Sequence, residues 1–96
     1  MDKAPAVIVK FETPSYGQLI IETSDRMRYY SDLSSLDKTY CYPKNLDQWR
    51  NASIDSYGLA LVWQSRFEAH IDQIIGLAFK NEPVLESAYV PKKHSG

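Results

Sequence analysis

The strongest constraint on the fold is a short strand, apolar on both faces, that leads directly into a longer apolar segment. Leu59–Trp63 has the sequence Leu-Ala-Leu-Val-Trp, which is typical of a strand covered on both sides. Ser65 and Glu68 then have the spacing of a capping box, in which two side chains satisfy the free backbone N–H groups at the start of a helix. The sequence therefore predicts an amphipathic helix over Arg66–Lys80.

The apolar residues of this predicted helix cover more of its surface than one sheet can hide. Several recur at helical spacing, and two more widen the arc to roughly 200° at about 100° per residue. We therefore expect either Val84–Val90 or a second protein chain to cover the flanks of the helix. The residues at helical spacing are Phe67, Ile71, Ile74, Ile75 and Ala78, and the two flanking residues are Leu77 and Phe79.

Alternating apolar residues in the first third of the chain predict an antiparallel meander. The two connections between its three strands are too short for crossovers, so consecutive strands must run in opposite directions. The three strands of the meander are expected at Ala6–Phe11, Gln18–Thr23 and Met27–Ser31. Two later strands are expected at Ala52–Asp55 and Leu59–Trp63, and short helical segments at Leu33–Leu36 and Asn45–Arg50.

Together these elements predict a small α+β protein. Residues 1–90 are expected to form one domain, in which the C-terminal amphipathic helix packs on a small antiparallel sheet of about five strands. Residues 91–96 are expected to form a flexible C-terminal end. A length of 96 residues leaves room for one domain.

Charge and cysteine content exclude several classes of function. Eleven basic and 12 acidic side chains give a net charge of −1, whereas a protein that binds nucleic acid without specificity needs a basic surface. A single cysteine, Cys41, allows neither an internal disulfide nor a zinc site built from thiolates. The start, Met1–Pro5, lacks the layout of a secretion signal, and no apolar run is long enough to cross a bilayer. We expect a cytoplasmic protein with no membrane partner and no nucleic-acid partner.

No arrangement of reactive side chains predicts an enzyme. Cys41 with His70 or His94 is the only nucleophile and base pair that the residue types allow, and nothing nearby in the sequence would activate the thiol. Five aspartates fall at turns or strand ends, where capping of local backbone N–H groups explains them. The four glycines are scattered and form no phosphate-binding loop. We expect no catalytic residues, no cofactor and no metal. The five aspartates are Asp25, Asp32, Asp37, Asp47 and Asp55.

Tyrosine and tryptophan are the residue types of this chain that are best suited to binding. These side chains offer a large contact area at a small cost in conformational entropy, which is why they gather in interfaces. Core packing is the expected role of Trp63, whereas a loop around Cys41 is difficult to bury completely. The alternative is a small-molecule pocket between sheet and helix, lined by Trp49, Trp63 and tyrosines. The candidate interaction surface consists of Tyr40, Tyr42, Trp49, Leu77 and Phe79.

The order of these elements resembles a bacterial family known as domain of unknown function 2442. The resemblance spans roughly residues 16–75 and rests on short motifs. Two positions depart from the family pattern. Arg26 stands where the family has glycine after the turn aspartate, and the segment Gln64–Glu68 replaces a glycine-aspartate element after the tryptophan. The motifs are Tyr16–Ile21, Ser24-Asp25, Asp32-Leu33, Leu46–Trp49 and Leu61–Trp63.

The resemblance implies a compact α+β domain that acts as an adaptor or in an antitoxin-like regulatory role. The wide apolar arc and the aromatic loop both favour a non-enzymatic protein-binding or regulatory module. We expect it to work as a homodimer or with another small protein.

Overall fold

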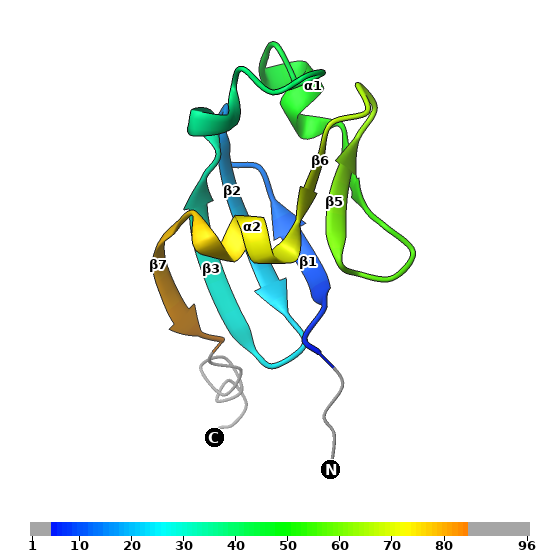
Figure 1. Cartoon of the computed structure of the whole chain (residues 1–96). Coiled ribbons are helices and arrows are strands. Elements are labelled where there is room, and N and C mark those ends of the chain that lie inside the picture. The colour runs from blue at the N-terminus through cyan, green and yellow to red at the C-terminus, as the bar shows by residue number, and fades with distance from the viewer. Residues whose placement is uncertain (1–4, 85–96) are drawn as a thin grey trace, which may run out of the picture.

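The predicted N-terminal meander forms the centre of the larger of two antiparallel sheets. The computed structural model describes residues 5–84. Strands β1, β2 and β3 pair in sequence order, and β7 adds to the other side of β3, while β4, β5 and β6 form the second sheet (Figure 1). The elements are β1 (Ile8–Glu12), β2 (Gln18–Thr23), β3 (Met27–Asp32), η1 (Ser34–Leu36), α1 (Leu46–Arg50), β4 (Ala52–Ile54), β5 (Ala60–Trp63), β6 (Glu68–His70), α2 (Ile71–Gly76) and β7 (Ala78–Pro83).

The α+β class is confirmed, but the prediction of one sheet of about five strands is wrong. The strands divide into a four-stranded sheet, β1-β2-β3-β7, and a three-stranded sheet, β4-β5-β6. The two sheets meet at β1, where the N–H of Ile8 donates to the carbonyl of Gly58 at 2.7 Å. The short helical segments at residues 33–36 and 45–50 form close to their predicted positions, as η1 and α1.

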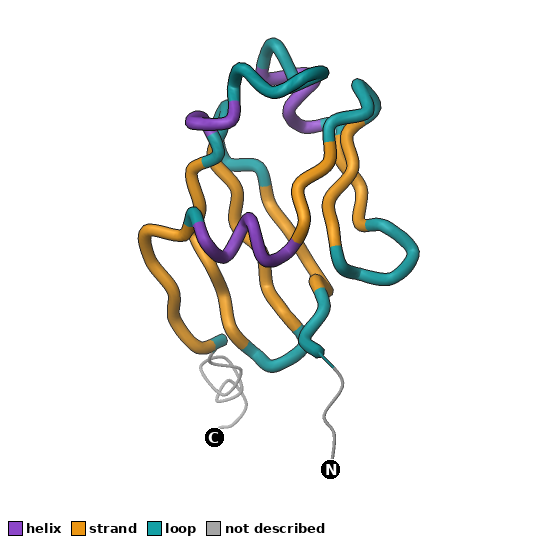
Figure 2. The backbone as a smooth tube through the Cα atoms, viewed as in Figure 1, coloured by secondary structure: helices purple, strands orange, loops and turns teal. Residues whose placement is uncertain are grey.

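Loops and short helices gather beyond one end of the larger sheet. Figure 2 shows η1, α1 and the loop between them at this end, above the strands in the view. Helix α2 instead lies across one face of the sheet, and the hydroxyl of Ser31 on β3 donates to the carbonyl of Ile74 at 2.7 Å (Figure 1). The side chains of Leu19 and Ile21 on β2 fill the buried space on the covered face.

The helix that the sequence predicts over Arg66–Lys80 does not form as one element. This segment forms a strand, a helix of six residues and a second strand, namely β6, α2 and β7. Ser65 and Glu68 do not cap a helix, because Arg66 adopts a φ of 80° and turns the chain back into β6. The helix starts later, where Nδ1 of His70 accepts from the N–H of Asp72 at 3.2 Å.

Two overlapping periodicities explain this error. Phe67, Ala69 and Ile71 are buried at every second position, as in a strand with one covered face. Ile71 and Ile74 are then three residues apart and both buried, as on one side of a helix. Read as one segment, these residues mimic a single wide apolar arc.

The wide arc therefore does not exist, and it gives no reason for a second chain. Its residues are shared among the β5–β6 turn, α2 with its C-cap, and β7, and most pack into the core of one protomer. Phe79 on β7 is the exception, with 64% of its surface exposed. Of the tail that was expected to cover the arc, only Val84 lies within the described residues.

Several tight turns between neighbouring strands contain a residue in the left-handed backbone conformation. Arg66 closes the β5–β6 turn, where its N–H donates to the carbonyl of Trp63 at 2.9 Å and the N–H of Trp63 donates to Phe67 at 2.9 Å. Arg26 has a φ of 69° in the β2–β3 turn, and Gly58 has a φ of 73° in the β4–β5 turn. At Gly58 a Cβ atom would also lie 2.8 Å from the Cβ of Val7, so a side chain here requires its neighbours to shift.

We predict opposite effects on stability for two substitutions at these turns. Gly58→Ala should lower the free energy of unfolding by about 2 kcal/mol, because it adds both left-handed strain and the clash with Val7. Arg66→Gly should raise the free energy of unfolding by about 0.5–1 kcal/mol, since relief of strain exceeds the entropy cost of glycine. Urea unfolding of both variants measures these changes. Destabilisation by Arg66→Gly would contradict the strain argument.

Candidate interaction surface

A stacked pair of tryptophans holds the two sheets and α1 together. The rings of Trp49 on α1 and Trp63 on β5 lie 5.0 Å apart between centroids with an interplanar angle of 29°. Nε1 of Trp49 donates to the carbonyl of Gln18 on β2 at 2.8 Å, and Nε1 of Trp63 donates to the carbonyl of Trp49 at 2.7 Å. Both indoles are buried and both N–H groups have partners, so this pair is part of the core.

The aromatic packing continues from this pair towards the surface. Tyr42 contacts Trp49 at 5.8 Å and Phe67 at 5.1 Å between ring centroids. Tyr16 lies 6.3 Å from Tyr42 and from Trp49, in edge-on geometry. The Tyr16 hydroxyl donates to the carbonyl of Pro43 at 2.7 Å, and 46% of this residue is exposed. Tyr16 is thus the outermost ring of a continuous aromatic cluster.

The structure divides the five predicted surface residues between core and surface. Tyr42 and Trp49 are buried, at 5% and 0% exposed, so little of either ring is available to a partner. Leu77 is half-buried against the core. Tyr40 and Phe79 are exposed as predicted, at 87% and 64%, but they belong to distant elements: Tyr40 to the loop before α1, and Phe79 to β7 (Figure 1).

Tyr40 instead shares a surface with Tyr16, which the sequence analysis did not select. Both residues line an open hollow of about 510 Å³, named here the aromatic hollow. Pro14 and Gly17 on either side of Tyr16 suggested only a turn, so the sequence held no signal that Tyr16 and Tyr40 would line the same hollow. The aromatic hollow is lined by Tyr16, Asp37, Thr39, Tyr40, Cys41, Tyr42, Pro43 and Lys44.

The loop that carries Tyr40 has a fixed backbone. The N–H of Thr39 donates to the carbonyl of Leu36 at 2.8 Å, and the N–H of Tyr42 donates to the carbonyl of Thr39 at 3.1 Å. Cys41 has a φ of 64°, and its carbonyl accepts from the Ser65 hydroxyl at 2.6 Å. These bonds hold the loop against the β5–β6 turn while the Tyr40 ring points into solvent.

The hydroxyl of Tyr42 is buried below this loop without a hydrogen-bond partner among residues 5–84. Only 5% of Tyr42 is exposed, and an added Cβ on Gly17 would lie 3.6 Å from the hydroxyl oxygen. Burial raises the pKa of Tyr42 to about 12, with smaller contributions from Tyr16, Asp32 and Asp37. The neutral phenol is thus strongly preferred in the folded state.

We predict that Tyr42→Phe removes part of the alkaline sensitivity of the fold. A tyrosine in the unfolded chain ionises near pH 10, whereas folded Tyr42 stays neutral to about pH 12. The unfolded state therefore binds fewer protons above pH 10, and the stability of the wild type falls there. Between about pH 9 and pH 11 the wild type should lose about 1 kcal/mol more than Tyr42→Phe. Urea unfolding at both pH values measures the difference, and equal losses would contradict the assignment.

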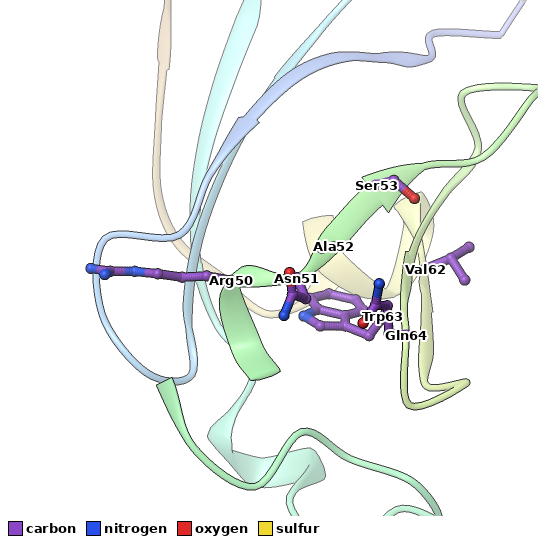
Figure 3. A pocket seen from close by; sticks show the side chains of 7 residues that line it. All are labelled: Arg50, Asn51, Ala52, Ser53, Val62, Trp63 and Gln64. Atoms are coloured by element: carbon purple, nitrogen blue, oxygen red, sulfur yellow. The ribbon is translucent and has the colours of Figure 1, made fainter. Parts of the chain in front are cut away.

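The tryptophans that were expected to line a small-molecule pocket mostly pack on each other. Trp63 does border a second hollow of about 360 Å³ between α1 and the three-stranded sheet. Figure 3 shows the side chains of Asn51 and Gln64 beside the indole, while the Arg50 side chain extends away from them. Because the indole is 2% exposed, this hollow offers little aromatic surface to a ligand.

Several of the candidate reactive side chains form hydrogen bonds with nearby backbone groups. His70 caps α2 through Nδ1, and His94 lies outside the described residues. Within residues 5–84 there is no group of three His, Cys, Asp or Glu side chains able to hold a metal ion. Asp32 accepts from the N–H of Ser34 at 2.8 Å, and hydrogen bonds from Ser34 lower the pKa of this carboxyl. Asp55 accepts from the N–H groups of Tyr57 and Leu59, so the predicted capping role is confirmed for both aspartates.

The face of the four-stranded sheet opposite α2 carries a row of alternating charges. Lys10 on β1 pairs with Glu22 on β2, Glu22 with Arg28 on β3, and Arg28 with Glu82 on β7. Nη2 of Arg28 lies 2.6 Å from Glu22, and Nη1 lies 3.7 Å from Glu82. A hydrogen bond from the Tyr30 hydroxyl at 2.7 Å, with help from Lys80 and Arg28, lowers the pKa of Glu82. Each strand thus presents a charge opposite to that of its neighbour.

Comparison with known proteins finds no protein-family model, no curated protein and no solved structure that matches this chain. Among residues 5–84, no helix has the length and apolar character needed to cross a membrane.

Proposed function

We propose that this protein is a non-enzymatic protein-binding module that contacts its partner through the aromatic hollow. The exposure of Tyr40, at 87%, is the observation that carries this proposal. The backbone on either side of this exposed ring is held by hydrogen bonds, so binding does not have to order the loop. Tyr16 offers a second ring whose hydroxyl is already bonded to Pro43, and the aromatic cluster holds this ring in place.

The charges at the rim define the kind of partner that suits this surface. Asp37 and Lys44 stand on the border of the aromatic hollow, with one charge of each sign. A loop or extended segment of another protein would place apolar side chains between Tyr16 and Tyr40 and polar groups against this rim. The partner in this proposal is therefore a folded protein, and not nucleic acid or a lipid surface.

Two backbone conformations support a relationship to domain of unknown function 2442. The chain departs from the family pattern at Arg26 and within Gln64–Glu68, where the family has glycine. Arg26 and Arg66 have φ values of 69° and 80°, a conformation that glycine adopts without strain. Both departures thus coincide with turns that a glycine would fit. We infer that the chain is a member of this bacterial family and serves as a cytoplasmic adaptor or regulatory protein.

Photo-crosslinking at two exposed tyrosines tests the proposed surface. A photoreactive phenylalanine analogue replaces Tyr40 in one variant and Tyr57 in another, since Tyr57 is also exposed, at 77%, but lies in the β4–β5 turn. We expect one discrete protein adduct at position 40 and none at position 57 in cells of the native host. Adding Tyr16→Ala to the position-40 variant should reduce the adduct about tenfold or more, because a central ring is lost.

Two results would contradict this proposal. Equal labelling at positions 40 and 57 would show that exposure alone explains the adducts. An absence of adducts at position 40, in a variant with unchanged urea unfolding, would show that the aromatic hollow contacts no protein.

A further inference from the structure

The outer edge of β7 is the longest unpaired strand edge of the larger sheet. β7 pairs with β3 on one side, and within residues 5–84 no strand pairs with its other side. The opposite edge strand, β1, is in contact with the β4–β5 turn through Ile8 and Gly58. An unpaired edge presents free N–H and C=O groups that can accept another strand.

The register between β3 and β7 shows which backbone groups face outward. The N–H of Val84 donates to the carbonyl of Arg26 at 2.9 Å. Because hydrogen-bonded pairs alternate along an antiparallel ladder, the backbone groups of Glu82 and Lys80 also face β3, and those of Asn81 and Pro83 face outward. Pro83 has no N–H to donate, so its place on the outward side costs β3 no hydrogen bond.

The charges on β7 would be complementary to those of a second, antiparallel copy of β7. Lys80 and Glu82 lie on the same face, one residue either side of Asn81. If a second β7 runs antiparallel with Asn81 opposite the partner's Asn81, then Lys80 lies opposite the partner's Glu82, and Glu82 lies opposite the partner's Lys80. No other central residue of this strand would put opposite charges together at both positions.

We propose that two copies of this chain pair through β7, centred on Asn81, to form one continuous eight-stranded antiparallel sheet. Asn81 and the partner's Asn81 exchange two backbone hydrogen bonds, and Lys80 and Glu82 form two symmetric cross-strand ion pairs. This interface is separate from the aromatic hollow and does not depend on the function proposed for it.

The existing charge row supports this partner. Along the sheet the order is Lys10, Glu22, Arg28 and Glu82, and the next residue across the interface is the partner's Lys80. The alternation of charge therefore continues from one subunit into the other. Phe79, which is exposed at the bulge between β3 and β7, would lie opposite the partner's Pro83 and gain an apolar contact.

Charge reversal at two positions tests this dimer. Lys80→Glu makes the strand acidic at both positions, and Glu82→Lys makes it basic at both. Each variant alone places like charges opposite each other twice, so we expect its dimerisation constant to weaken on the order of 100-fold. An equimolar mixture of the two variants restores both opposite-charge contacts and should form a one-to-one heterodimer. Sedimentation equilibrium measures the association of each variant alone and of their mixture. A mass tag on one variant distinguishes the heterodimer from the two homodimers.

Two further variants keep the test specific. Lys10→Glu reverses the charge at the far end of the same row and should leave the dimer unchanged. Asn81→Pro removes an N–H that faces outward, so it should abolish dimerisation while circular dichroism stays that of the wild type. The heterodimer of charge-reversed chains also shows that each of them is folded.

Several results would overturn the proposal. A monomeric wild type would do so. This holds even if removal of residues 85–96 then produces a dimer, because those residues rather than a second copy would cover the edge in the wild type. A dimer that is unaffected by Lys80→Glu and Glu82→Lys, or variants that do not associate when mixed, would equally exclude pairing through β7. None of these results bears on the crosslinking at Tyr40, so the two proposals fail separately.

Discussion

The stacked indoles of Trp49 and Trp63 are the interaction on which the rest of the fold depends. Each sheet is too small to bury a core of its own, and the two sheets meet near β1. The tryptophan pair supplies the missing connection, since its two N–H groups join β2 to α1 and α1 to β5. The loop with Tyr40 then rests on the same cluster through Tyr42. Both the larger sheet and the candidate binding surface are therefore positioned by one aromatic contact.

Local patterns predicted those parts of the fold that depend on neighbours in sequence. The meander, η1, α1 and β5 follow from alternation, turn residues and short connections, and all were predicted close to their observed limits. The segment after Trp63 was not predictable in this way, because Ser65 and Glu68 satisfy the capping pattern and the apolar residues fit two periods at once. Arg66 ends the strand-to-helix ambiguity, because it adopts a left-handed backbone conformation that is normally expected of glycine. Pairing of β7 with β3, about 50 residues earlier in the chain, then stabilised a strand over a helix.

The sequence predicted that aromatic side chains would form the candidate surface, but it did not predict which ones. An exposed tyrosine in the loop before α1 was expected, and Tyr40 fulfils this. Burial of Tyr42 and Trp49 depends on rings contributed by the β1–β2 turn, β5 and the β5–β6 turn, and no local pattern encodes these contacts. Tyr16 was missed for the same reason, since its position beside Pro43 is a product of the tertiary fold.

The position of β7 has a consequence for synthesis on the ribosome. The last described strand completes the larger sheet by joining a strand made about 50 residues before it. Until that strand leaves the exit tunnel, the nascent chain holds β3 with one side bare, and the hydroxyl of Ser31 has no α2 to bond. The long loop that must close places this step late in folding. Translation past residue 83 must therefore precede formation of the native sheet, and a pause before residue 78 would prolong the interval in which other chains can compete for β3.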